Sequence, residues 1–482
     1  MDILFVATEL APYVQAGGSA PVVAALGKTL RQLGHKVTVA MPRFPGFERG
    51  GLLVARRLTP ISFPFGGSTV ELTVYDGRLA SGIELVLLDG PGLFFDREGI
   101  YGEPGGGEYD DNLFRFAVFS KGVAELVRHR ANLGTPFDLV HAHDWATALV
   151  PVYLRGVARE TGLAIPTVLG ITDPTAQGTF PVKRLPQLEL PAEDAALLKQ
   201  GTQLSFLQGG VRAAERVVVA SKSLALDADN VGAPLSKALT AIEDALVEIP
   251  PGIDYAVWNP ATDPALVARY DAEDSSAKER CKTDVLRELN LPLDQGRPLV
   301  VHLGMSQDEG TDLVSAAMGR IVRSGALVAV AGKGDPKLTT TVQRSAARLG
   351  GDAVVVADPA DALVHRLLSA ADIVLVPTRK PSTETAHLRA QRYGALPVVS
   401  AALRDAVVDC DVALETGTGI VFEKATAPAL VGATQRAMAA YAHPRWPLLR
   451  RRLMRLDLGW DRPARRYEQL YRNLLTGKPL PR

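Results

Sequence analysis

The sequence predicts an α/β protein made of two doubly wound domains that face a central cleft. Two series of short apolar runs alternate with longer segments whose apolar residues recur at helical spacing. Such alternation favours parallel sheets with helices on both faces. Pro250 and Pro251 separate the two series and predict a stiff, extended link. We therefore expect one domain over residues 1–249 and a second over residues 250–482, with ligands beyond the C-terminal ends of the strands.

The first strand, turn and helix are the clearest unit in the chain. Residues 2–6 form an apolar strand, Gly17 and Gly18 follow, and Val22, Val23 and later leucines recur at helical spacing. A glycine pair lets a ligand approach the backbone, and a helix N-terminus offers free N–H groups to an anion. A plain strand-to-helix turn fits this stretch equally well, because short glycine pairs are common.

The remaining elements follow in two series. In the first half we expect helices near residues 112–127 and 147–157, and strands near residues 3–6, 36–40, 85–88, 139–142, 167–171 and 216–220. In the second half we expect strands near residues 298–303, 326–331, 353–357, 373–376, 396–400 and 419–422. The helices between them are expected near residues 311–322, 338–349, 361–370, 385–393 and 427–441. The highly charged segment 273–282 predicts a solvated helix or loop.

Composition and charge exclude several classes of function. The 482 residues are 47% hydrophobic, which is ample for two cores, and 53 Lys and Arg balance 53 Asp and Glu. This balance gives no basic field for nucleic acid and no polybasic tail for a membrane. No window approaches the roughly 20 apolar residues of a membrane span, and the N-terminus lacks the basic region of a signal peptide. We expect a cytoplasmic protein.

Metal and disulfide sites are not predicted. Cys281 and Cys410 are the only cysteines, too few for a disulfide framework or a cysteine zinc site. His141 and His143 lie two apart on a predicted strand and would share a face. A structural, hydrogen-bonded role suits such a pair better than metal binding.

Several long motifs are spread over nearly the whole chain. The most specific are HAHDW at residues 141–145 and WNPATD at 258–263; others lie at 8–12, 109–112, 177–178, 332–336, 392–394 and 467–471. Together they resemble the bacterial glycogen synthase and starch synthase family. Members are retaining glucosyltransferases of the GT-B architecture that move glucose from ADP-glucose to the end of an α-1,4-glucan. The resemblance implies two Rossmann-like domains, an acceptor-side domain over 1–249 and a nucleotide-side domain over 250–482 that carries the C-terminal helix.

The first half departs from the family at positions that contact the donor. Gln15 stands where the family has a lysine that meets the donor, and Pro21 replaces an aspartate. Thr172 stands where a histidine lines the pocket near the transferred sugar, and Ala176 replaces an aromatic residue.

The second half departs more sharply. Gly304 and Glu309 align with an arginine and a lysine that bind the donor diphosphate, and Pro381 aligns with the glutamate taken to assist transfer. Glu384 takes a glycine's place at a helix N-terminus, and the Thr-Gly-Gly turn expected after the strand ending at Ser400 looks deleted.

These replacements oppose diphosphate binding. Each lost charge-assisted contact costs roughly 1.5–3 kcal/mol, and a carboxylate ~4 Å from a phosphate charge repels it by about 4 kcal/mol at an effective dielectric of ~20. We therefore favour a catalytically inactive relative that keeps the GT-B shell and serves a binding or regulatory role, with an α-glucan or a protein as its partner. The alternative is an active glucosyltransferase with a remodelled pocket for ADP-glucose or another sugar nucleotide, in which Arg379 and Lys380 restore charge or Glu384 replaces the missing glutamate. A transferase for a different acceptor is a third possibility.

The candidate site residues follow from the resemblance. No residue is predicted as catalytic, because the family positions hold Thr172 and Pro381. No cofactor is predicted beyond weak binding of ADP or ADP-glucose. The residues expected near the nucleotide are Gly17, Gly18, Gly332, Gly334, Asp335 and Arg379. Those expected near the glucan are Glu9, Asp111, Asn112, His143, Asp144 and Trp145.

Overall fold

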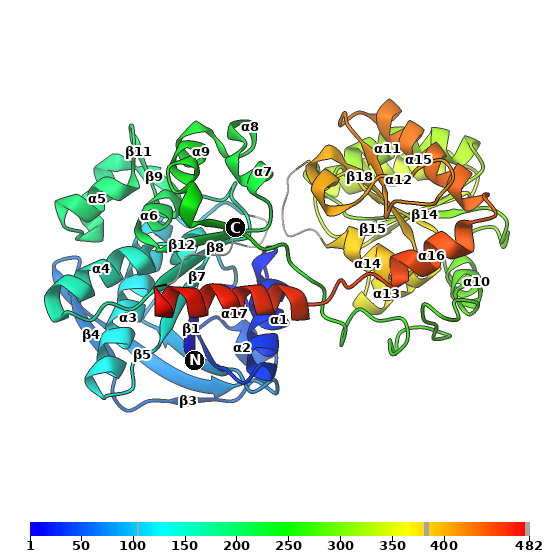
Figure 1. Ribbon diagram of the computed structural model, residues 1–482. Coiled ribbons are helices and arrows are strands. Elements are labelled where there is room, and N and C mark those ends of the chain that lie inside the picture. Colours follow the sequence, from blue (N-terminus) through cyan, green and yellow to red (C-terminus); the bar gives the residue numbers. More distant parts are fainter. Residues whose placement is uncertain (104–105, 380–384, 478–482) are drawn as a thin grey trace. The chain divides into compact units, whose positions relative to one another are not determined.

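The chain folds into two compact units, each built on its own sheet (Figure 1). The computed structural model describes residues 1–103, 106–379 and 385–477. Unit 1 is Met1–Pro251 together with the chain from Trp460 onward, and unit 2 is Gly252–Gly459. The α/β class predicted from the alternating pattern is confirmed in both units.

Unit 1 contains a ten-stranded mixed sheet. From one edge its strands are β13 (Leu246–Glu248), β12 (Arg216–Val219), β8 (Thr167–Ile171), β7 (Leu139–His143), β1 (Asp2–Val6), β2 (Lys36–Pro42), β6 (Glu84–Asp89), β5 (Ser68–Arg78) and β3 (Val54–Arg56), with β4 (Ile61–Phe65) on β5. The run from β13 to β6 is parallel, whereas β3, β4 and β6 pair with β5 antiparallel. Sequence analysis missed β3, β4 and β5, whose alternating burial leaves many polar residues exposed.

Helices and a small second sheet complete unit 1. The short sheet joins β10 (Lys199–Gln200), β11 (Gln203–Ser205) and β9 (Thr179–Pro181). The α-helices are α1 (Ser19–Gln32), α2 (Gly46–Arg49), α3 (Asn112–Asn132), α4 (Leu149–Thr161), α5 (Ala192–Leu198), α6 (Phe206–Ala213), α7 (Lys222–Leu226), α8 (Ala228–Val231), α9 (Ala233–Thr240) and α17 (Asp461–Thr476). Short 3-10 turns lie at η1 (Trp145–Thr147), η2 (Val182–Leu188) and η3 (Glu243–Ala245).

The C-terminal helix α17 belongs to unit 1, where it lies beside α1 (Figure 1). The sequence-based division placed it in the second domain. Its buried stripe explains the difference: the Tyr471 hydroxyl lies 2.7 Å from His141 Nδ1, and the Tyr467 ring packs on the same histidine. Glu468 adds a contact to His35 at 3.1 Å. The chain enters unit 2 after Pro251, close to the predicted boundary.

Unit 2 contains a six-stranded, fully parallel sheet. Its strands in order are β16 (Ala353–Ala357), β15 (Leu327–Gly332), β14 (Leu299–Leu303), β17 (Ile373–Val376), β18 (Leu396–Ser400) and β19 (Ile420–Phe422). Its helices are α10 (Lys278–Glu288), α11 (Thr311–Arg323), α12 (Pro336–Ala347), α13 (Asp361–Ala370), α14 (Ala386–Arg392), α15 (Ala427–Tyr441) and α16 (Trp446–Met454), with η4 (Ala401–Ala406) after β18.

Both faces of this sheet are buried, as its apolar strands require. Val300 of β14 packs in one apolar cluster with α11, α12 and α15. Its neighbours Leu299 and Val301 point the other way, into a cluster with α10, α13 and α14. This alternation is what a doubly wound sheet demands of each strand.

The charged segment 273–282 does not form a solvated element throughout, which corrects the expectation from its composition. Lys278 is buried, and its Nζ donates to the carbonyls of Ser369 and Tyr393 at 2.8 and 2.9 Å. Lys282 is also buried and forms an ion pair with Asp372 at 2.7 Å. The long lysine stems pack in the core because their charged ends find acceptors there.

No helix that the structure describes is both long and apolar enough to span a membrane. Within the same residues, no group of three or more histidine, cysteine or acidic side chains is placed to hold a metal ion.

Candidate functional site

In unit 1 the candidate residues gather beyond the C-terminal ends of parallel strands. Glu9 follows β1, Asp144 and Trp145 follow β7, and Thr172 follows β8. β1, β7 and β8 are neighbours in the sheet, so their ends bring these residues to one edge. Ligands of open α/β sheets bind at this edge.

The Glu9 carboxylate fills the first glycine loop. Its Oε2 accepts from the backbone N–H groups of Ala16 and Gly17 at 2.9 and 2.7 Å. A Cβ on Gly17 would lie 3.2 Å from Glu9 Oε1, so glycine here makes room for the carboxylate. Gly18 directly precedes α1. The side chain of Gln15 is exposed and donates to the Pro12 carbonyl at 3.3 Å.

Tyr101 is a site residue that sequence analysis missed. Its hydroxyl donates to Glu9 Oε1 at 3.1 Å and lies 2.8 Å from Thr8 Oγ1. Burial raises the pKa of Tyr101 well above its usual value, so the phenol stays neutral and donates to the carboxylate. The sequence gives only a weak signal, an aromatic residue between Gly99 and Gly102 in a loop before α3.

Asp144 ties the end of β7 to the end of β8. Its Oδ1 accepts from the backbone N–H groups of Thr172 and Asp173 at 2.6 and 3.2 Å. Asp144 holds a positive φ of 59°, an uncommon backbone geometry for a non-glycine residue. Burial raises the pKa of this carboxyl to about 7. Thr172, which the resemblance places at a family histidine, offers a hydroxyl with no basic nitrogen.

Trp145 is the aromatic centre of this edge. Its ring packs against Tyr101 and Phe116 at centroid distances of 5.5 and 5.1 Å. Gly178 has a φ of +57°, and a Cβ there would lie 2.2 Å from the indole ring. Gly178 is therefore required by the tryptophan, which explains the Gln-Gly pair in the sequence without a ligand.

His143 and His141 are core residues under this edge. Their rings pack at 4.1 Å between centroids, with Phe5 against both. Burial lowers both pKa values, that of His143 to about 3, so both are neutral at pH 7. A structural role fits them, and the expected contact of His143 with a glucan stays a prediction.

Asn112 and Asp111 begin α3 and hold neighbouring backbone. Asn112 is fully buried; its amide donates to the Tyr101 carbonyl at 2.8 Å and accepts from Arg115 at 2.9 Å. Asp111 forms a bidentate ion pair with Arg97 at 2.8 and 2.6 Å. Asn112 thus positions Tyr101, and any glucan contact from these two residues remains a prediction.

A pocket of about 470 Å³ opens beside the glycine loop. It is bordered by Tyr13, Gln15 and Tyr101, and by the charged side chains of Arg49, Glu98, Glu103 and Glu108. Aromatic faces beside carboxylates and a guanidinium suit a polyhydroxylated ligand, because they offer apolar contact and many hydrogen-bonding groups.

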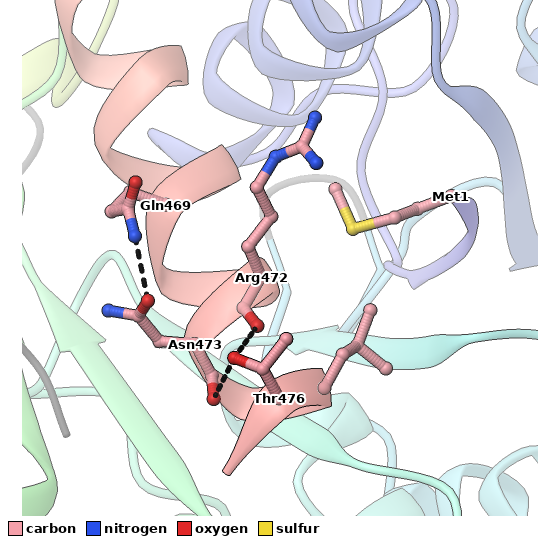
Figure 2. A pocket seen from close by; sticks show the side chains of 6 residues that line it. Met1, Gln469, Arg472, Asn473 and Thr476 are labelled. Carbon is pink, nitrogen blue, oxygen red and sulfur yellow. Dashed lines mark hydrogen bonds between the residues drawn. The ribbon is translucent and has the colours of Figure 1, made fainter. Parts of the chain in front are cut away.

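A second hollow of about 350 Å³ lies by the N-terminal end of β1, away from the C-terminal strand ends (Figure 2). Met1, which directly precedes β1, and residues in the second half of α17 line it. In Figure 2 the polar groups of Gln469 and Thr476 are bonded within α17 itself, to Asn473 and to the carbonyls of Arg472 and Asn473. This hollow offers no converging reactive groups.

In unit 2 the first strand ends in a turn that is closed by a carboxylate. Glu309 Oε2 accepts from the backbone N–H groups of Met305 and Ser306 at 2.9 and 3.0 Å, and from Ser306 Oγ at 2.8 Å. The Glu309 N–H donates back to Ser306 Oγ at 3.2 Å. A Cβ on Gly304 would lie 3.0 Å from the Glu309 side chain.

Arg379, the cation expected at the end of β17, is bound within the same turn. Its guanidinium forms a bidentate pair with Asp312 at 2.6 and 2.7 Å and also donates to the Gln307 carbonyl. The pairing raises the pKa of Arg379 and lowers that of Asp312. Its charge is therefore already compensated. Arg404, another cation near a strand end, forms an ion pair with Glu423.

Gly332, Gly334 and Asp335 have structural roles in the next turn. A Cβ on Gly334 would lie 2.3 Å from the Met305 carbonyl oxygen, and one on Gly332 would lie 2.7 Å from the Gly304 carbonyl carbon. Asp335 caps α12 by accepting from the Lys337 N–H at 2.7 Å. The glycines let two backbone turns touch, and nucleotide contact by these residues stays a prediction.

Three residues of the predicted donor side, Lys380, Pro381 and Glu384, lie outside the described residues. Ser400 ends β18 with its hydroxyl hydrogen-bonded to the Thr378 carbonyl, and η4 follows at once.

Comparison with known proteins identifies the family. The family described as starch synthase catalytic domain matches residues 2–236, and glycosyl transferases group 1 match residues 297–440. Proteins named glycogen synthase from Thioalkalivibrio sulfidiphilus and Opitutus terrae are 34% and 33% identical to this chain, covering 99% and 98% of it and all of their own length.

Solved structures agree on the fold. The catalytic domain of starch synthase IV from Arabidopsis thaliana, bound to ADP and acarbose, superposes with a TM-score of 0.86 at 24% identity, over 99% of both chains. Sucrose-phosphate synthase from Thermosynechococcus elongatus gives a TM-score of 0.60 at 18% identity, over 99% of this chain and 100% of its own. The chain belongs to the bacterial glycogen synthase and starch synthase family and has the GT-B fold of that family's glycosyltransferases.

Proposed function

We propose that the protein works in α-1,4-glucan metabolism as a glycogen synthase-type protein that binds α-glucan and does not transfer glucose from ADP-glucose. The observation that carries the proposal is the Glu309 carboxylate, seated on the turn after β14 where the family has a diphosphate-binding lysine. Unit 1 supplies the glucan side, and in the described part of unit 2 Gly304 and Glu309 stand where the resemblance expects cations for the donor.

Glucan binding is supported by the edge of unit 1. Glu9 accepts from the Tyr101 hydroxyl there, Asp144 holds the backbone after β8, and a pocket with aromatic and charged walls opens beside the glycine loop. Glucans are bound through hydroxyl hydrogen bonds and ring stacking, both of which this pocket offers. A protein partner stays a further possibility for a regulatory role.

The absence of transfer is supported by charge. Departure of a nucleoside diphosphate needs preorganised positive groups. Gly304 and Glu309 remove two, and Arg379 is occupied by Asp312. Losing two charge-assisted contacts costs roughly 3–6 kcal/mol, which corresponds to a rate loss of at least about 100-fold.

An active glucosyltransferase is the second candidate, and the comparisons favour it. Relatives at 33–34% identity over nearly the full chain carry the name glycogen synthase, and the Arabidopsis relative was solved with ADP. In this alternative, other groups replace the missing cations and the family glutamate whose place Pro381 takes. Pro381 lies outside the described residues.

Incorporation of radiolabelled glucose into glycogen separates the two candidates. The full chain is incubated with glycogen and with ADP-glucose or UDP-glucose, beside the Thioalkalivibrio relative. We expect a rate at least about 100-fold below that of the relative with both donors. A rate within about tenfold of the relative with either donor would establish the active enzyme instead.

A further inference from the structure

The turn at the end of β14 is an anion-binding group of backbone amides that the chain itself fills. Successive N–H groups of Met305 and Ser306 converge on one point, the geometry by which backbone turns hold phosphate or carboxylate. The Ser306 hydroxyl adds a third donor at 2.8 Å. The anion at that point is Glu309 Oε2.

We propose that Glu309 is an internal occupant of this turn that excludes the phosphate of a nucleoside diphosphate. The inference rests on the proposed function and gives its donor side a mechanism. The Glu309 carboxylate excludes phosphate mainly by filling the turn and less by charge repulsion at a distance. The three donors of the turn are already satisfied by the carboxylate, so none is left for a ligand.

The surroundings hold the occupied state in place. Arg379 grips the turn through its bonds to Asp312 and to the Gln307 carbonyl, and the Arg379 N–H donates to the Asp308 carbonyl at 2.8 Å. Gly304 completes the arrangement, since any side chain there begins 3.0 Å from the Glu309 Cβ. With Glu309 seated in the turn, position 304 therefore favours glycine.

The Ser306-to-Glu309 spacing is also that of a capping box, in which both side chains satisfy backbone donors at the start of a helix. A capping box alone predicts that removing the carboxylate only weakens the turn. Occupancy predicts in addition that the emptied turn gains affinity for phosphates. The two accounts therefore differ in a measurable binding property.

The test compares two variants of the full chain by calorimetric titration with ADP and with inorganic pyrophosphate. Glu309→Ala empties the turn, whereas Glu309→Gln removes the charge and keeps an oxygen that accepts from the same amides. Asp361→Asn, on an exposed residue of α13, is the control for loss of one negative charge. Thermal melting of each variant checks that unit 2 still folds.

We expect Glu309→Ala to bind both probes at least about tenfold more tightly than the wild type, and Glu309→Gln to gain clearly less. Equal gains in the two variants would overturn occupancy in favour of charge. No gain in Glu309→Ala would overturn the inference while leaving the proposed function standing. Micromolar ADP binding by the wild type would instead contradict the proposed function itself.

Discussion

The two units solve the same local problem with the same chemical group. In each, the backbone after the first strand turns sharply, and a glutamate carboxylate accepts two consecutive N–H groups: Glu9 at the glycine loop of unit 1 and Glu309 at the turn of unit 2. Glu9 is 3% exposed and receives a further bond from Tyr101, whereas Glu309 is only partly buried.

The two glutamates differ in how they relate to the family pattern. Glu9 belongs to the motif by which the chain resembles its family, so unit 1 keeps an inherited framework. Glu309 stands where the resemblance predicts a lysine, and the nearby Arg379 is paired with Asp312. A similar hydrogen-bond pattern thus involves a residue of the family motif in unit 1 and, by our proposal, excludes phosphate in unit 2.

The largest effect is expected where unit 1 depends on one glycine. Gly178→Ala places a Cβ 2.2 Å from the Trp145 ring at a φ of +57°, so we expect a loss of about 3 kcal/mol or more in unfolding free energy. Gly156→Ala is the control: it lies at a partly buried position of α4 where a Cβ would meet only the Arg159 side chain at 3.9 Å, and it should stabilise by roughly 0.5–1 kcal/mol. Calorimetric melting measures both, and equal melting temperatures would show that Trp145 is not held as described.

A smaller effect compares the two carboxylates directly. Glu9→Ala removes a carboxylate that is only 3% exposed and leaves the Ala16 and Gly17 N–H groups and the Tyr101 hydroxyl without their acceptor, which should cost about 2–4 kcal/mol. Glu309→Ala removes a carboxylate that is partly exposed to water before the change, so it should cost less, about 1–2 kcal/mol. Denaturant unfolding of the full chain gives both values. A larger loss for Glu309→Ala would reverse the proposed ranking of the two turns.

Sequence reasoning predicted the fold well where one physical signal dominates. The near-continuous apolar runs of β14 and β17, which are buried on both faces, indicate a parallel sheet covered by helices. It misplaced α17 because an amphipathic stripe shows that a helix packs but not on which unit. It expected solvent around Lys278 and Lys282 because acceptors distant in sequence, such as Asp372, cannot be seen from composition.

Sequence motifs predicted some residues of the candidate site, and the others are evident only from contacts in the structure. Glu9 and Asp144 were identified, but their binding to loop amides and to the amides after β8 depends on the turn geometry. Tyr101 lies 92 positions from Glu9 and outside the motifs that carry the family resemblance. The hydrogen bonds of Glu309 within its turn could have been predicted from the local Ser-x-x-Glu spacing that begins at Ser306.

Separate calorimetric titrations of the unmodified protein with maltoheptaose and with ADP test the central claim most directly. The account predicts saturable heat with the glucan and none with ADP up to about 1 mM, a limit of about −4 kcal/mol in binding free energy. Saturation by ADP at micromolar concentration, with or without glucan binding, would contradict it.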